Sequence, residues 1–141
     1  MKPRPRATRA AGVALAAALA VLAPAPVAFA GGSASLSLEI TPQSREESRA
    51  IRTGLALYGL ARGIESGAIV DQKGRANAAG IAQIGRGNQG VIHQDGRDHD
   101  ASIRQHGNRN AYGIFQFGRG TSGHVAQRGN GGSGVLIQMG W

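Results

Sequence analysis

The stretch from residue 72 to residue 107 reads QKGRANAAGIAQIGRGNQGVIHQDGRDHDASIRQHG, and it contains a strictly spaced motif. It holds four Gln-x-Gly triplets, and successive glutamines are always eleven residues apart. The triplets continue at this interval to the end of the chain, and their glutamines are Gln72, Gln83, Gln94, Gln105, Gln116, Gln127 and Gln138. Their glycines are Gly74, Gly85, Gly96, Gly107, Gly118, Gly129 and Gly140. A period held this strictly is typical of a repeat architecture.

The positions before each triplet alternate in character. The residue two places before each Gln is always aliphatic, and these candidate core residues are Val70, Ile81, Ile92, Ile103, Ile114, Val125 and Leu136. Four places before each Gln the residue is small in every repeat except at Tyr112. The small, aliphatic, Gln and Gly positions therefore recur with a period of two, which is the period of a β-strand. We expect this set to point inward and the irregular positions between them to point outward.

Short connectors rich in Gly and Asn separate the strands, and both residues suit tight turns because they tolerate positive φ. Eleven residues accommodate one strand of about five or six residues and one turn. Two such halves make one 22-residue coil. The sequence therefore predicts a mainly β protein, a β-solenoid of stacked strand-turn-strand coils.

Stacked coils would place the glutamines in two ladders. Gln72, Gln94, Gln116 and Gln138 fall in one ladder, and Gln83, Gln105 and Gln127 fall in the facing one. Identical amides about 4.8 Å apart can hydrogen-bond along the stack, which supplies partners to a buried Gln. Five residues after their glutamines, Asn77, Asn88 and Asn110 are expected to act in the same way.

A right-handed coiled coil also has an eleven-residue period. It is disfavoured here because each Gly would cost a helix about 1 kcal/mol, and because the apolar residues alternate by two.

The repeats resemble the curlin repeat, whose fixed positions are Ser, Gln, Gly, Asn, Ala and a second Gln. Residues 66–83 match all of these positions, with Ser66, Gln72, Gly74, Asn77, Ala79 and Gln83. The next coil keeps Gln94, Gly96, Ala101 and Gln105, with Asn88 for Ser and His99 for Asn. The third keeps Gln116, Gly118 and Gln127, with Asn110, Thr121 and Gly123 at the other positions. The resemblance covers residues 66–141.

Curlins are secreted subunits of curli, the extracellular functional amyloids of bacterial biofilms. The resemblance implies a structural subunit that polymerises with itself by strand stacking into a fimbrial fibre for adhesion and matrix building. It also implies a nucleator or major-subunit counterpart and an outer-membrane export pore, with extracellular polysaccharide or a host surface as a further partner. Two alternatives stay open: a minor nucleating curli subunit, and a monomeric β-solenoid that binds a regular surface.

The first 30 residues have the layout of a secretory signal peptide, with a basic start, an apolar run and a cleavage site formed by Ala28 and Ala30. Cleavage removes four basic residues and lowers the net charge from +8 to +4, so the charge gives little reason to expect specific nucleic-acid binding. The chain has no Cys, which excludes disulfides and thiolate metal sites.

Residues 31–65 do not follow the repeat. They contain a short alternating run, Leu36–Ile40, and then a capping box at Ser44–Glu47 that predicts a helix over about residues 43–62. We expect this helix to cap the first coil and shield its edge. By the resemblance, the segment would instead direct export, and the two roles are compatible.

The sequence offers no arrangement typical of catalysis, and it predicts neither an enzyme nor a cofactor. His93, Asp95, Asp98, His99, Asp100 and His106 cluster in the chain without the spacing of a known metal motif. We interpret them as surface charge that slows stacking, with a pH-sensing role left open.

The C-terminal run from Val135 to Trp141 is apolar on both faces of its strand, and Phe115 and Phe117 flank Gln116 on the outer face. An exposed apolar strand recruits other chains, so this run is the predicted docking edge.

Overall fold

The computed structural model describes residues 34–63 and 67–141, which fall in one compact unit within Ser33–Trp141. The predicted signal peptide, with Ala28 and Ala30, lies outside the described residues. The elements are β1 Ser35–Ile40, α1 Arg45–Ala61, β2 Ala68–Arg75, β3 Ala78–Ile84, β4 Gln89–Arg97, β5 Asp100–His106, β6 Ala111–Arg119, β7 Ser122–Arg128 and β8 Ser133–Gly140.

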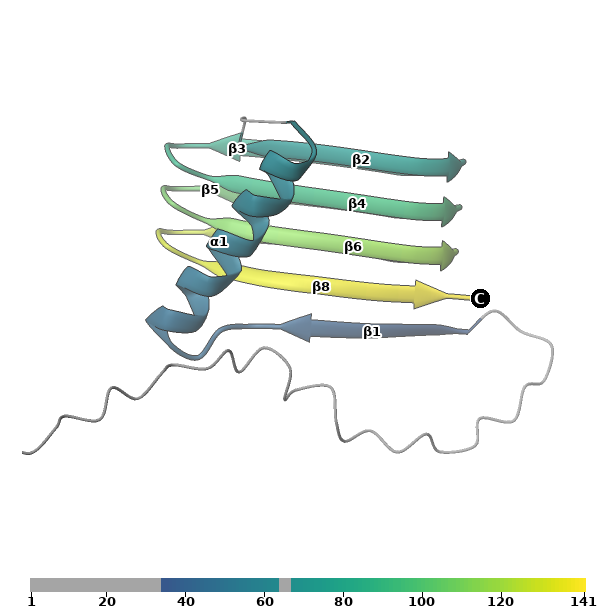
Figure 1. Cartoon of the computed structure of the whole chain (residues 1–141), viewed down its shortest axis with the longest axis horizontal. Helices are drawn as coiled ribbons and strands as arrows, with labels where there is room; N and C mark the ends of the chain where they lie inside the picture. The colour runs from purple at the N-terminus through teal and green to yellow at the C-terminus, as the bar shows by residue number, and fades with distance from the viewer. Residues whose placement is uncertain (1–33, 64–66) are drawn as a thin grey trace, which may run out of the picture. The chain divides into compact units, whose positions relative to one another are not determined.

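The repeats form a β-solenoid of two facing parallel sheets (Figure 1). In the first, called sheet A, β2, β4, β6 and β8 lie side by side. In the second, called sheet B, β3, β5 and β7 do the same. Neighbouring strands align residues that are 22 apart, so each coil repeats the one before it. This confirms the predicted fold class, a mainly β solenoid of about three coils with one helix.

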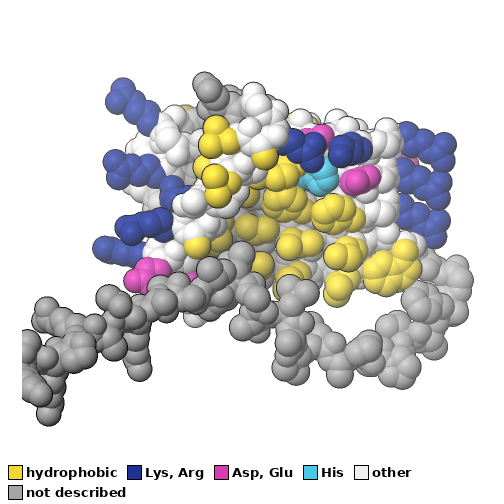
Figure 2. Space-filling view, in the orientation of Figure 1, with side chains coloured by type: hydrophobic (Ala, Val, Ile, Leu, Met, Phe, Trp, Pro, Cys, Tyr) yellow, Lys and Arg dark blue, Asp and Glu magenta, His cyan; other side chains and the backbone are white. Residues whose placement is uncertain are grey.

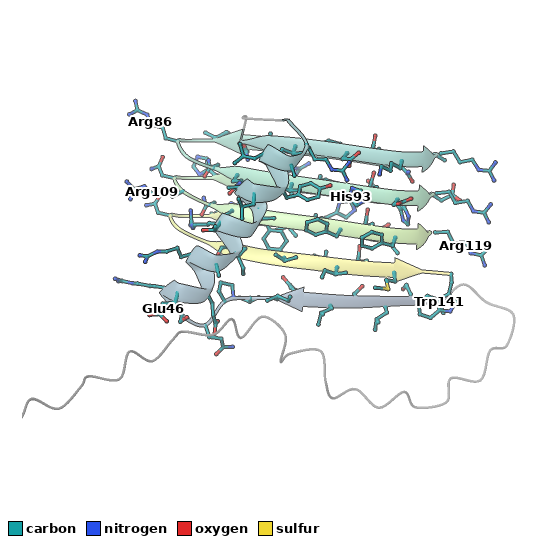
Figure 3. All side chains as sticks on the ribbon, viewed as in Figure 1. Glu46, Arg86, His93, Arg109, Arg119 and Trp141 are labelled. Carbon is teal, nitrogen blue, oxygen red and sulfur yellow. The ribbon has the colours of Figure 1, made fainter. Side chains whose placement is uncertain are left out.

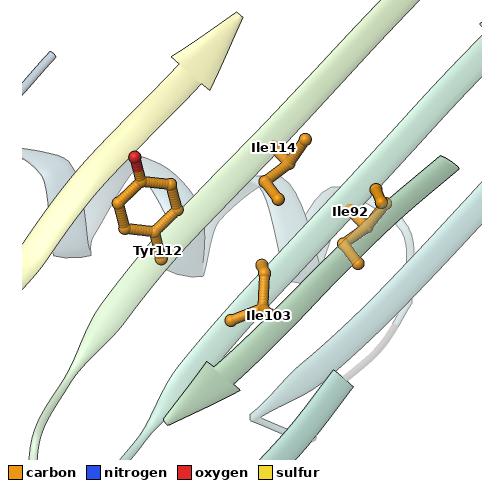
Figure 4. Close-up of a cluster of buried hydrophobic side chains, with 5 residues drawn as sticks. Ile92, Ile103, Tyr112 and Ile114 are labelled. Carbon is orange, nitrogen blue, oxygen red and sulfur yellow. The ribbon is translucent and has the colours of Figure 1, made fainter. Parts of the chain in front are cut away.

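The core lies between the two sheets and is built from the inward aliphatic positions (Figure 4). Ile92 and Ile114 from sheet A meet Ile103 from sheet B, and all three have no exposed surface. Each fully buried Ile contributes about 1.5–3 kcal/mol to folding. At the ends of the stack the same column is less protected, and Val70 is 44% exposed.

The outer face of sheet A is partly covered by α1, which crosses β4, β6 and β8 (Figure 1). Leu55 of the helix packs on Ile69, Val91 and Ala111, which are outward positions of the repeat. These three side chains point outward as expected, but the helix buries them. The repeat pattern describes one sheet face, whereas their burial comes from the amphipathic helix outside the repeats.

The helix itself begins close to where its capping signal predicts. The Ser44 hydroxyl accepts a hydrogen bond from the Glu47 backbone N–H at 3.1 Å, and α1 then runs to Ala61. Its position differs from the expectation, because it lies across a sheet face and does not shield the edge of the first coil. Within the described ranges, no helix is both long enough and apolar enough to span a bilayer.

The alternating run before the helix forms β1, which pairs with β8. This pairing is antiparallel, unlike every pairing between the repeat strands, and it aligns Ser37 with Gln138. Sheet A therefore has five strands in the order β1-β8-β6-β4-β2, and sheet B has three. The C-terminal strand, predicted to be an exposed docking edge, is covered by β1.

Candidate functional site

The two glutamine ladders run through the interior of the solenoid. In sheet A the Nε2 group of Gln72 donates to Oε1 of Gln94 at 2.7 Å, and the chain continues through Gln116 to Gln138 with two bonds of 2.8 Å. In sheet B, Gln83 donates to Gln105 and Gln105 donates to Gln127, each at 2.8 Å. Every amide points the same way, so each ladder has an acceptor end and a donor end.

The second amide hydrogen of Gln94, Gln105 and Gln116 crosses to the other sheet. Gln94 Nε2 also donates to the Ala78 carbonyl at 2.8 Å, and Gln116 Nε2 donates to the Asp100 carbonyl at 3.0 Å. Gln94 and Gln116 have no exposed surface, yet their amides are well paired. These bonds therefore offset the cost of burying a polar side chain.

The predicted asparagines tie successive turns together. The Asn88 side chain donates to the Gly107 carbonyl at 2.9 Å and accepts from the Asn110 backbone N–H at 3.1 Å. One coil later, the Asn110 side chain donates to the Gly129 carbonyl and accepts from the Gly132 backbone N–H. The Asn77 side chain accepts from the backbone N–H of His99.

A further asparagine ladder escaped the sequence reasoning. Asn108 Oδ1 accepts from the Arg86 N–H, and Asn130 Oδ1 accepts from the Asn108 N–H, both at 2.9 Å. Asn108 and Asn130 are 22 residues apart, and this spacing could have predicted the ladder from the sequence.

The triplet glycines are required where the strands turn. Gly96 has φ of +137°, and a Cβ there would overlap the carbonyl oxygen of Gly118 in the next coil. Gly74, Gly85 and Gly107 meet the glycine one coil later in the same way. Gly129 has φ of +101° but faces open space, because it lies at the end of sheet B. The close approach between coils therefore depends on Gly wherever a following coil exists.

The histidine and aspartate cluster is dispersed by the fold. His93 is 7% exposed beneath α1, and His99 is 1% exposed within the turn, so the interpretation as surface charge is wrong for both. His99 replaces Asn in the stack and its Nδ1 contacts the Thr121 hydroxyl at 2.8 Å. Among the described residues, no group of three His, Asp or Glu side chains is placed to hold a metal ion.

A polar cluster anchors α1 to sheet A around His93 (Figure 3). The Asp71 carboxylate lies 3.0 Å from His93 Nδ1 and 2.8 Å from the Arg62 guanidinium, and the Tyr58 hydroxyl lies 2.9 Å from His93 Nδ1. Burial alone would raise the pKa of Asp71, but the hydrogen bond with His93 and the charge of Arg62 outweigh it. The pKa of Asp71 therefore lies below its usual value. Phe115 packs edge-on against Tyr58 at 5.6 Å between ring centroids.

The outer surface carries two other features (Figure 2). Apolar side chains of β1, β6 and β8 form a patch beside the helix, with Leu36, Phe117 and Met139 at least a third exposed. Arg75, Arg97 and Arg119 stand in register at the ends of their strands, and Arg86 and Arg109 lie at the opposite margin (Figure 3). Positive charges at strand ends oppose indiscriminate pairing.

The two ends of the solenoid differ in their outermost strands. At the N-terminal end these are β2 and β3, so the acceptor oxygens of Gln72 and Gln83 mark that end. At the C-terminal end they are β7 in sheet B and β1 in sheet A. Gln138, the last of its ladder, donates to the Ser37 hydroxyl of β1 at 3.0 Å.

These features define a parallel two-sheet β-solenoid with internal amide ladders. The family model described as the curlin associated repeat matches residues 74–107, so the chain contains curlin repeats. Comparison with curated proteins and with solved structures gives no match. The matched stretch lies within the solenoid, from the end of β2 to the turn after β5.

Proposed function

We propose that the chain is the structural subunit of a secreted, curli-type amyloid fibre that grows by stacking solenoids end to end. The observation that carries the proposal is the polarity of the two ladders. Each ends in a Gln acceptor at one end of the solenoid and a Gln donor at the other. Such ends are complementary to those of another copy, and strand edges template further strands.

The cellular role extends this proposal. Residues 1–30 would direct secretion, an outer-membrane pore would export the chain, and the fibre would serve adhesion and the biofilm matrix at the cell surface. A nucleating counterpart and an extracellular polysaccharide or host surface would be its other partners. The rival role, a monomeric module that reads a regular surface, needs a repeated outward column. Sheet B presents Ala82, Arg104 and Ala126 in register, which is not such a column.

The test is thioflavin-T kinetics on residues 31–141, with and without sonicated seeds of its own product, together with fibre diffraction. We expect seeds to shorten the lag and reflections near about 4.8 and 10 Å. A protein that stays monomeric for days would contradict self-templated growth. That result would favour the binding module or a subunit that requires a separate nucleator.

Substitutions at the ladder ends test, in the same assay, whether the ladders take part in assembly. Gln72→Ala and Gln138→Ala each remove one terminal amide, so both should slow seeded growth more than Arg86→Ala, which changes an exposed turn. Equal rates for all three variants would refute the role of the ladders in assembly.

A further inference from the structure

The repeat region contains an odd number of strands. Sheet A holds four of them, ending at β8, and sheet B holds three, ending at β7. Among the described residues, no strand of sheet B faces β8 across the core. The inward Leu136 of β8 is accordingly only partly buried, whereas Ile114 of the preceding strand has no exposed surface. Across the described residues, the solenoid therefore comprises three and a half coils.

An added copy must complete this half coil. If it stacked without rotation, its β2 would lie on β8, and its β3 would be separated from β7 by one missing strand. A half-turn about the solenoid axis removes the gap. It exchanges the two sheets and keeps all strands parallel, because facing strands of a solenoid run in opposite directions. The eleven-residue period makes this exchange acceptable, since both sheets carry the same Gln, Gly and aliphatic columns.

We infer that a second copy adds after a half-turn, pairing its β2 with β7 and its β3 with the edge of β8 that β1 now covers. This inference rests on the proposed fibre function. The junction places Gln72 of the incoming copy on Gln127 and its Gln83 on Gln138, so both ladders continue from donor to acceptor. It also puts an incoming strand opposite β8, which completes the burial of Leu136.

In this arrangement β1 is a removable cap. Its six residues are all exposed, it runs antiparallel, and its Ser37 hydroxyl takes the hydrogen bond that a stacked Gln would accept. A second side-chain hydrogen bond, from the Tyr112 hydroxyl to Glu39 at 2.8 Å, also joins it to the solenoid. Among the described strands, none pairs with the outer edge of β7. The incoming β2 can therefore pair with β7 first, after which β3 of the same copy displaces β1 from β8.

Cysteine pairs distinguish the two stacking modes, because the natural chain has no Cys. A half-turn brings residue 73 of one copy beside residue 128 of the next, whereas unrotated stacking brings it beside residue 139. All three positions are exposed. Aligned residues on neighbouring strands lie about 4.8 Å apart, within the Cα separation that a disulfide bridges. Fibres of residues 31–141 carrying K73C/R128C or K73C/M139C would be grown under reducing conditions, oxidised and run on non-reducing gels.

The half-turn predicts a ladder of covalent multimers for K73C/R128C and none for K73C/M139C. The reverse pattern would overturn it in favour of unrotated stacking. Fibres that cross-link in neither variant would also overturn it, because the two ends would then not meet. If the unmodified chain forms no fibres at all, the proposed function fails and the inference fails with it.

A second pair tests the cap. L36C/M139C joins facing, exposed residues of β1 and β8, so the disulfide holds the cap in place. Seeded growth should be lost in the oxidised protein and recovered on reduction. The control, S102C/H124C, joins neighbouring strands of sheet B away from β8 and should grow equally well in both states. Equal growth of oxidised and reduced L36C/M139C would show that β1 need not leave.

Discussion

Sheet A and sheet B are built from the same repeat but end in different environments. Sheet A has its outer face partly covered by α1 and its last repeat strand paired with β1. Among the described residues, no helix packs on the outer face of sheet B, and β3 and β7 are its outermost strands. Both differences come from residues 34–62, which lie outside the repeats. The comparison shows that a short non-repeating segment can make two equivalent sheets unequal, protecting one and leaving the other available for pairing.

Glycine substitutions should give the largest contrast. Gly96→Ala in sheet A imposes positive φ on Ala and drives its Cβ into the Gly118 carbonyl, so we expect it to destabilise the monomer by about 3–5 kcal/mol. Gly129→Ala at the end of sheet B imposes the unfavourable φ but causes no overlap with a neighbouring coil. It should therefore lower the free energy of unfolding by only about 1–2 kcal/mol. Urea unfolding of the two variants measures the difference, and equal losses would contradict the close approach between coils.

The same Gly129→Ala variant should also stop fibre growth. In the half-turn junction the methyl group meets the Gly74 carbonyl of the incoming copy. Gly87→Ala is the matched control, because Gly87 also has positive φ and a Cβ there would make only ordinary contact with Arg109, but it lies in the turn between β3 and β4 and not on β7. Seeded growth that is equally slow in both variants would assign the effect to strain alone.

Ladder substitutions should have an intermediate effect. Gln116→Ala removes the amide between Gln94 and Gln138 in the buried ladder of sheet A. The substitution leaves buried polar groups of Gln94 and Gln138 unpaired, which should lower the free energy of unfolding by about 2–3 kcal/mol. Gln83→Ala, at the partly exposed end of sheet B, should cost less than about 1 kcal/mol because water can replace the lost partner. Urea unfolding checks both values, and a larger loss for Gln83→Ala would reverse the comparison.

Acid should loosen α1 from sheet A. The pKa of Asp71 is lower in the folded protein than in the unfolded chain. The stability it contributes is therefore present above the unfolded pKa and is lost as the pH falls through the folded pKa, below about pH 4. Hydrogen-exchange protection of α1 should fall across this range. Asp71→Asn should have weak protection at every pH, and Asp95→Asn, an exposed carboxylate outside the cluster, should keep the response of the natural chain.

The smallest effect is expected on the outer face of sheet B. Arg104→Ala removes an exposed side chain that lies between Ala82 and Ala126, so stability should change by less than about 0.5 kcal/mol. A loss above 1 kcal/mol in urea unfolding would show that this face is more constrained than its exposure indicates.

Much of the fold follows from the sequence because the repeat specifies its own pairing. The eleven-residue period assigns Gln94 to sheet A and Gln105 to sheet B, and the aliphatic column assigns Ile92 and Ile103 to the core. The repeat says nothing of what lies outside it. The burial of Val91 and His93 depends on Leu55 and Tyr58, and the partner of β8 depends on Ser37 and its neighbours. These contacts join residues far apart in the chain without a shared period, so no pattern marks them.

End-to-end stacking of solenoids fixes the helical symmetry of the assembled fibre, and cryo-electron microscopy of fibres grown from residues 31–141 would measure that symmetry. Seven strands in two sheets advance three and a half coils, so continuous stacking predicts a rise of about 17 Å per subunit and a rotation close to a half-turn. A rise of about 19 Å without that rotation, or fibres whose subunits do not stack along the solenoid axis, would contradict the account.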